Sequence, residues 1–160
     1  MTNKLFVLVL ASTLAVSACS HKKPVADEGS LPSAANADVN GGDSDNGKAM
    51  GLQTIHFGYD AYTIDAETKA TLKANAAILK DKGSIKIQIE GHCDQRGGIE
   101  YNVALGEKRA NSVKKYLEGL GIAADRIAVI SFGKEKLLDS SMTEEAYAKN
   151  RRANFAITSH

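Results

Sequence analysis

The sequence lacks tryptophan and has only two prolines and two cysteines in 160 residues. Two cysteines exclude a scaffold of several disulfides, and the four histidines are scattered rather than clustered. Neither sign of charge dominates, because 20 Lys and Arg face 19 Asp and Glu, which argues against a non-specific polyanion binder. With 43 % hydrophobic residues, the chain has enough apolar material for a core. Function is therefore expected from local groups of residues in a folded domain.

The one long hydrophobic run, Leu5 to Val16, is too short to span a bilayer comfortably. It follows a single Lys and precedes small residues, which is typical of a secretory signal peptide. Val16-Ser17-Ala18-Cys19 resembles the bacterial lipobox, which implies that residues 1–18 are removed and that Cys19 is lipidated. Ser20 implies the outer membrane, because Asp at this position is the usual signal for inner-membrane retention. The alternative is an ordinary secretory signal with a coincidental Cys.

A polar segment, residues 19–51, separates this signal from the rest of the chain. It is rich in Ala, Asp, Asn, Gly and Ser and has no periodic apolar face. Such a composition buries too little apolar area to offset the entropy of ordering, so we expect a flexible tether. Residues 52–160 are numerous enough to fold alone.

Strand and helix patterns alternate over residues 52–160. Strands are expected over residues 53–57, 84–91, 127–132 and 153–158, where short β-prone runs or alternating apolar residues occur. Helices are expected over residues 65–82, 100–119 and 141–151, from apolar spacings of four and three, an Asp at 65, and a motif at 141–144 that resembles a capping box. The order βαβαβαβ predicts an α/β sandwich with a mixed four-stranded sheet and helices on one face.

The densest group of polar and glycine residues, residues 91–98, directly follows the second expected strand. Ligand sites in α/β sheets lie on loops beyond the strand ends, so Asp94 and Arg96 are candidates for contacting a small charged ligand. The alternative is a surface pair that only holds its own loop. Arg109 falls near the packed face of the second helix, where an unpaired buried charge is costly, so it must be paired or reach solvent.

Five motifs, in order and at family spacing, resemble the OmpA-like peptidoglycan-binding domain. They are Ile55 to Asp60, Glu90 to Gly97, Tyr101 to Asn111, Ser131 to Glu135 and Lys149 to Arg152. The match covers about residue 52 to the C-terminus. Within this superfamily, the Tyr-Asn-x-Ala-Leu-Gly and Gly-Lys-Glu motifs, together with the lipobox and the tether, are similar to the peptidoglycan-associated lipoproteins.

This resemblance implies a non-enzymatic clamp for meso-diaminopimelate in the peptide stem of peptidoglycan, without a cofactor or metal. The family's ammonium-binding Asp falls on Asp94 and its carboxylate-binding Arg on Arg109, a residue whose planar guanidinium suits a carboxylate. Arg96 completes the main expected site. Further family contacts fall on Tyr59, Asp60, Leu105 and Arg152. Arg152 has the alternative role of stabilising Asp94 or a neighbour.

The resemblance also implies partners in the Tol system, above all TolB, and a role in envelope integrity during cell division. No residues indicate a Tol-binding surface directly. A Tol-independent wall anchor with an OmpA-like domain therefore stays open as an alternative.

Cys93 stands where the family usually has Thr, and Gly98 where Thr is frequent. Because His92-Cys93-Asp94 superficially suggests a thiol nucleophile with its base, a thiol-dependent periplasmic enzyme using Cys93 is a rival interpretation. Adjacent residues of an extended chain point to opposite sides, so His92 is poorly placed to take a proton from Cys93. Three consecutive ligands, His92, Cys93 and Asp94, also lack the usual spacing of a metal site.

Replacing Cys19 by Ser removes the thiol that the lipobox presents for acylation. We expect Cys19→Ser to leave the membrane fraction, because stable anchoring depends on two or more acyl chains. Cell fractionation with detection of the protein measures this, and a Cys93→Ser control should stay with the outer membrane. Retention of Cys19→Ser in the outer-membrane fraction would contradict the lipid anchor.

Overall fold

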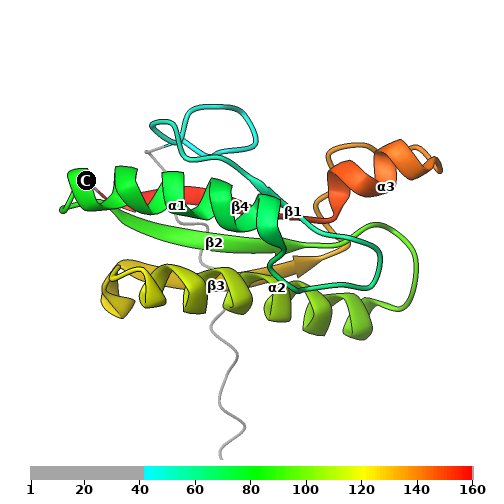
Figure 1. Cartoon of the computed structure of the whole chain (residues 1–160). Coiled ribbons are helices and arrows are strands. Elements are labelled where there is room, and N and C mark those ends of the chain that lie inside the picture. Colours follow the sequence, from blue (N-terminus) through cyan, green and yellow to red (C-terminus); the bar gives the residue numbers. More distant parts are fainter. Residues whose placement is uncertain (1–41, 160) are drawn as a thin grey trace, which may run out of the picture. The chain divides into compact units, whose positions relative to one another are not determined.

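Residues 42–159 are described by the computed structural model, and Figure 1 shows their arrangement. The elements are β1 (Ile55–His56), α1 (Ala66–Asp81), β2 (Lys86–His92), α2 (Ile99–Gly119), the short 3-10 helix η1 (Ala124–Arg126), β3 (Ile127–Gly133), α3 (Glu144–Asn150) and β4 (Arg152–Ser159). The expected alternation of strands and helices is confirmed. No helix within residues 42–159 has both the length and the hydrophobicity to cross a membrane.

The four strands form one mixed sheet in the order β1-β4-β2-β3. β2 and β3 are parallel and are connected through α2, whereas β4 pairs antiparallel with both β1 and β2. Helices α1 and α2 lie on the same side of this sheet (Figure 1), as expected. The core fills the space between them and includes Leu72, Leu79, Ile87, Ile89, Val113, Leu117, Phe155 and Ile157.

The helices begin where side chains cap them. Asp65 accepts a hydrogen bond from the backbone N–H of Thr68 (2.8 Å) at the start of α1, as its position in the sequence predicts. Helix α3 begins later than expected, because Thr143 is the N-cap and accepts from the N–H of Ala146 (3.3 Å). The expected start at residue 141 is therefore wrong.

The boundary expected between tether and domain, after residue 51, is also wrong. Asp43 forms a β-bridge with Ala156 of β4, and the N–H of Ser44 donates to the carbonyl of Phe155 (3.0 Å). Ala49 is completely buried in the core. Asn, Asp and Ser side chains form hydrogen bonds with the backbone of turns, and the same residues are common in solvated tethers. Composition alone therefore did not distinguish a turn packed on the domain from a flexible tether. Residues 19–41 of the expected tether, and the signal peptide, lie outside the described residues.

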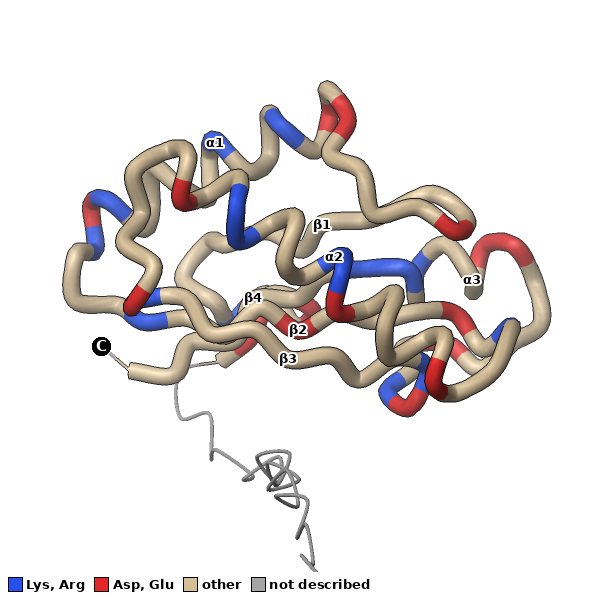
Figure 2. Tube along the Cα trace, turned by 90° about the horizontal axis from the view of Figure 1, so that it is seen from below, with Lys and Arg blue, Asp and Glu red and all other residues tan. Residues whose placement is uncertain are grey.

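Charged residues of both signs are interspersed along the domain, as Figure 2 shows. This agrees with the near balance of the whole chain, which has a formal charge of +1. Long-range attraction therefore gives little selectivity, and recognition of a charged ligand depends on individual side chains.

Two glycines allow α2 to lie unusually close to β2. A Cβ atom at Gly91 would overlap the carbonyl oxygen of Gly106, and a Cβ at Gly106 would lie 2.9 Å from the carbonyl oxygen of Gly91. This close packing fixes the position of the N-terminal half of α2 relative to the loop after β2. The candidate site is built between these two segments.

Substituting Gly91→Ala should therefore force α2 away from β2 and destabilise the domain by about 1–3 kcal/mol. Gly119→Ala, at the end of the same helix, is the control, because a Cβ there has no neighbour within 4 Å. Denaturant unfolding of both variants measures the difference. An unchanged unfolding midpoint for Gly91→Ala would contradict the close packing.

Candidate binding site at the end of β2

A cavity of about 140 Å³ lies where the chain leaves β2 and enters α2. Its wall consists of Tyr59, Asp60, Cys93, Asp94, Arg96, Gly97, Tyr101, Asn102, Leu105, Arg109 and Arg151. Pockets for drug-sized ligands measure about 300–1,000 Å³. This cavity therefore suits a small polar group, such as the end of one amino acid.

Six of the seven binding residues expected from the sequence are brought together here. They are Tyr59, Asp60, Asp94, Arg96, Leu105 and Arg109. The seventh, Arg152, is not part of the wall. A larger, more open groove of about 540 Å³ beside β1 and the start of α1 contains none of the seven. Cys19 lies outside the described residues.

The expectation for Arg152 is corrected by the alternation of β4. Ala153 and Phe155 face the helices and the core, so Arg151 lies on their side of the sheet and Arg152 on the other. Arg152 is buried there and its Nε donates to Oδ2 of Asp45 at 2.7 Å. Arg151 takes the place in the cavity wall that was expected for Arg152.

Helix α2 supplies one side of the cavity through residues spaced by four. Tyr101, Leu105 and Arg109 succeed one another on the same face of the helix and all line the cavity. Asn102 ties the preceding loop to this helix, because its Nδ2 donates to the carbonyl of Arg96 at 2.7 Å. The loop and the helix are thus held in a fixed relation.

Arg109 is the largest fully buried side chain of the described residues and is 1 % exposed. It donates four hydrogen bonds, to the carbonyls of Ala61 (2.8 Å), His92 (2.8 Å) and Gly58 (3.2 Å) and to Sγ of Cys93 (3.4 Å). Burial lowers the pKa of Arg109, but a guanidinium does not lose its proton in proteins. Within residues 42–159, no carboxylate forms an ion pair with it. The cavity wall therefore contains a buried positive charge without an acidic partner.

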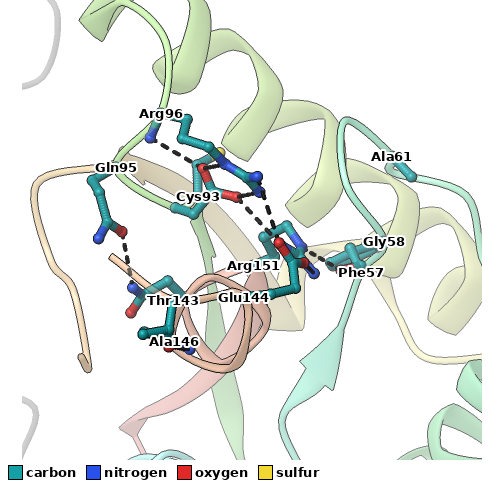
Figure 3. Close-up of polar contacts among 12 residues, drawn as sticks. Phe57, Gly58, Ala61, Cys93, Gln95, Arg96, Thr143, Glu144, Ala146 and Arg151 are labelled. Atoms are coloured by element: carbon teal, nitrogen blue, oxygen red, sulfur yellow. Dashed lines mark hydrogen bonds and ion pairs between the residues drawn. The ribbon is translucent and has the colours of Figure 1, made fainter. Parts of the chain in front are cut away.

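Asp94 carries the charge opposite to that of Arg109, and two guanidinium groups contact its carboxylate. Arg96 binds it in a bidentate manner, Nη2 to Oδ2 at 2.7 Å and Nε to Oδ1 at 3.2 Å, and Arg151 Nη1 lies 3.4 Å from Oδ2. Arg151 also pairs with Glu144 of α3 at 2.9 Å. Figure 3 shows Arg96, Arg151 and Glu144 converging. Burial acts to raise the pKa of Asp94, but these hydrogen bonds outweigh it and the pKa lies below its usual value.

Aromatic rings position Arg96 and form the rim of the cavity. The guanidinium carbon of Arg96 lies 4.5 Å from the ring centre of Tyr59 and 4.1 Å from that of Tyr147. Such stacking holds the guanidinium flat without using its N–H groups. In the same wall, the hydroxyl of Tyr101 donates to Asp60, the residue that follows Tyr59. Asp60 has a left-handed backbone, with φ of 49°, which turns the loop towards the cavity.

Cys93 and His92 do not form a nucleophile and base. Sγ of Cys93 donates to the carbonyl of Asn102 (3.3 Å), and burial raises the pKa of this thiol. The ring of His92 stacks on Phe132 at 5.5 Å, and its Nε2 lies 3.6 Å from a carboxylate oxygen of Glu90. The two side chains thus have separate environments, which speaks against a thiol enzyme. Among residues 42–159, no group of three acidic, His or Cys side chains is arranged to hold a metal ion.

Sequence reasoning missed Tyr101, Asn102 and Arg151 in the wall, and Tyr147 behind Arg96. The spacing of four from Leu105 and Arg109 was a usable signal for Tyr101. The alternation of β4 was a usable signal for Arg151. Tyr147 is brought in by tertiary packing of α3, and no local pattern indicates it.

The lowered pKa of Asp94 makes part of the stability pH-dependent. A carboxylate with a depressed folded pKa stabilises the fold above its unfolded pKa of about 3.9, and this contribution is lost as the pH falls through the folded value. We expect Asp94→Asn to lower the free energy of unfolding by roughly 1–3 kcal/mol at pH 7, with the difference from wild type shrinking below about pH 4. Urea unfolding across pH tests this, and a difference that stays constant with pH would contradict it.

Comparison with known proteins agrees with this fold. The OmpA family model matches residues 56–151. The peptidoglycan-associated lipoprotein of Pasteurella multocida is 38% identical over 151 residues, covering 94% of this chain and 95% of the relative, and that of Haemophilus influenzae is 39% identical with the same coverage. The crystal structure of the peptidoglycan-associated lipoprotein from Burkholderia pseudomallei is 36% identical, with a TM-score of 0.63 over 65% of this chain and 88% of that chain. The chain therefore belongs to the OmpA family and, within it, to the peptidoglycan-associated lipoproteins.

Proposed function

We propose that the folded domain binds peptidoglycan non-covalently and that a lipid on Cys19 ties it to the outer membrane. The membership among the peptidoglycan-associated lipoproteins supports the first part. The lipobox in the sequence supports the second. The protein would thus link two layers of the cell envelope.

The ligand that fits the cavity best is the side-chain end of meso-diaminopimelate in the peptide stem. This end carries a carboxylate and an ammonium on one carbon, so it needs a cationic and an anionic partner within a small space. The observation that carries the proposal is Arg109, a buried guanidinium without an acidic partner in the wall of the 140 Å³ cavity. A carboxylate placed beside Arg109 would compensate a charge that is otherwise costly to bury.

The hydrogen bonds of Arg109 leave room for this ligand. A guanidinium has five N–H groups, and four are used, so one on Nη2 is available. The bond to Sγ of Cys93 is the weakest of the four, since sulfur is a poor acceptor. A carboxylate oxygen is a stronger acceptor and would compete well for that N–H, which would give a bidentate contact.

The ammonium would be bound by Asp94 together with Asp60. Asp94 already contacts two guanidinium groups, so its own attraction for a further cation is reduced. Asp60 lines the same cavity and has the hydroxyl of Tyr101 as a neutral partner. Two carboxylates beside one ammonium would offset the positive charge of Arg96 and Arg151. Tyr59 and Leu105 supply apolar contacts to the methylene chain of the ligand.

This arrangement would discriminate between types of cell wall. In stems that contain lysine in place of diaminopimelate, the ammonium is present but the carboxylate on the same carbon is missing. Arg109 would then stay unpaired. A site built to bind a polar group strongly rejects an analogue that lacks this group.

Many weakly bound copies attached to one membrane act collectively, so a modest affinity of each domain is sufficient for envelope cohesion. Membership in this family also supports partnership with the Tol system, in particular TolB, and a role in cell division. A Tol-independent anchor is the alternative, and a binding assay with purified TolB separates the two. A thiol-dependent enzyme is disfavoured, because Cys93 is buried against Arg109 and Asn102.

Sedimentation with purified sacculi tests the proposed ligand. Wild type should sediment with diaminopimelate-type sacculi and poorly with lysine-type sacculi. Removing one partner of a buried charge pair costs about 2–5 kcal/mol, so Asp94→Ala and Arg109→Ala should each weaken binding by roughly 30-fold or more. Arg109→Lys keeps the charge but loses the planar donors, and should also bind weakly.

The exposed Asp81 at the end of α1 gives a matched control, since Asp81→Ala removes a carboxylate far from the cavity wall. Circular dichroism must show native folding of each variant. Unchanged sedimentation of folded Asp94→Ala and Arg109→Ala variants would refute the assignment.

A further inference from the structure

The carboxylate of Asp94 already has its acceptor positions filled by hydrogen bonds. Oδ1 accepts from the backbone N–H of Arg96 (3.1 Å) and from Nε of the same residue (3.2 Å). Oδ2 accepts from Nη2 of Arg96 (2.7 Å) and from Nη1 of Arg151 (3.4 Å). A carboxylate has about four lone-pair positions, which equals the number of these contacts. The ammonium of a ligand would therefore have to replace one of them.

The contact from Arg151 is the one that an ammonium replaces most easily. It is the longest of the four, whereas the other three come from one residue and act together. Tyr59 and Tyr147 also stack on the guanidinium of Arg96 and hold it in place. The side chain of Arg151 is only 8 % exposed, however, and a buried guanidinium without an anionic partner is unfavourable. Arg151 therefore needs another carboxylate if it gives up Asp94.

Glu144 is this second carboxylate. Its Oε1 lies 2.9 Å from Nη2 of Arg151, which is closer than the 3.4 Å between Arg151 and Asp94. Nε of Arg151 also donates to the carbonyl of Phe57 (3.1 Å), so two contacts hold this guanidinium independently of Asp94. Oε2 of Glu144 lies 3.5 Å from Nη1 of Arg96, and Figure 3 shows the three side chains together. Among residues 42–159, Asp94 and Glu144 are the two carboxylates that pair with these guanidinium groups.

The short helix α3 presents Glu144 to the two guanidinium groups. Glu144 is its first residue, and Tyr147 on the same helix stacks on Arg96. The side chain of Glu144 is 63 % exposed and does not belong to the cavity wall. Its effect on a ligand in the cavity would therefore pass through Arg151 and Arg96.

We propose that Glu144 is a positioning residue for the bound ammonium. It keeps Arg151 paired when the ammonium takes the place of this guanidinium on Oδ2 of Asp94. Three carboxylates then match three cations: Asp60, Asp94 and Glu144 against Arg96, Arg151 and the ammonium. Without Glu144, one of these cations lacks an anionic partner, and binding of the ammonium becomes weaker. This inference rests on the proposed function, because the ammonium must first bind at Asp94.

Calorimetric titration of the full chain in detergent with two ligands tests this role. The first is meso-diaminopimelate with one end blocked as the N-acetyl methylamide, which leaves one zwitterionic end. The second is 2-aminopimelate blocked in the same way, whose free end carries the carboxylate but no ammonium. Glu144→Gln should bind the first ligand about three- to tenfold more weakly than wild type, the range expected for two partly exposed ion pairs. It should bind the second ligand at least as tightly as wild type, because no ammonium then displaces Arg151 from Asp94.

Glu145→Gln is the matched control. It removes the same charge from the same turn of α3, and in the described part of the chain Glu145 forms no ion pair. We expect this variant to bind both ligands like wild type. A merely structural role of Glu144 would weaken both ligands alike, so the difference between the ligands identifies a positioning role.

The outcomes separate the two proposals. If wild type does not bind blocked diaminopimelate, the proposed function fails, and this inference fails with it. If wild type binds it and Glu144→Gln binds it equally tightly, the role of Glu144 is overturned and the proposed function stands. An equal loss for both ligands, or a similar loss in Glu145→Gln, overturns the role of Glu144 as well.

A crystal structure of wild type with blocked diaminopimelate is a second measurement, independent of the 2-aminopimelate ligand. We expect the ammonium beside Oδ2 of Asp94, with Nη1 of Arg151 beyond hydrogen-bonding distance of that oxygen. The pair between Arg151 and Glu144 should remain. A bound ligand with all four contacts to Asp94 unchanged would overturn the inference.

Discussion

The buried charge of Arg109 is the interaction on which the site depends. Three backbone carbonyls and one thiol hold its guanidinium in place, but none of them carries a compensating negative charge. Backbone carbonyls come from fixed segments of chain, so they fix the direction of the guanidinium more firmly than a flexible carboxylate side chain would. The fold thus supports a cation that is fully oriented and still electrostatically unpaired. The anionic ligand that we propose would relieve this condition, and its affinity would arise from a charge that the fold alone leaves uncompensated.

The rest of the domain holds the guanidinium of Arg109 in this position. Gly91 and Gly106 let α2 approach β2 until Arg109 reaches the carbonyl of His92 at the end of that strand. The second charge group, Asp94 with Arg96 and Arg151, joins the loop after β2 to the start of β4. Residues far apart in the sequence therefore meet at one end of the sheet. Here the polar groups of Asp94, Arg96 and Arg151 also satisfy one another, so the wall of the candidate site also joins separate segments of the fold.

Much of this was predictable from the sequence, for identifiable reasons. The apolar spacing of α1 and α2 and the alternation of β2 are strong periodic signals, and both describe elements that bury one face. The resemblance to a known family supplied Asp94 and Arg109, which local patterns alone left as candidates. The pairing of β4 between β1 and β2 depends on contacts distant in sequence, and composition could not show it. The predicted boundary between tether and domain, after residue 51, was wrong for a similar reason. Turn-forming residues have the same composition whether they pack on a domain or remain solvated.

The central claim is that Arg109 receives the carboxylate and the acidic side chains receive the ammonium of one amino-acid end. A crystal structure of the domain with meso-diaminopimelate tests it most directly. The account predicts a carboxylate oxygen within hydrogen-bonding distance of Nη2 of Arg109, and the ammonium beside Asp94 and Asp60. A ligand bound in the opposite orientation, or at another place on the domain while this cavity stays empty, would contradict it.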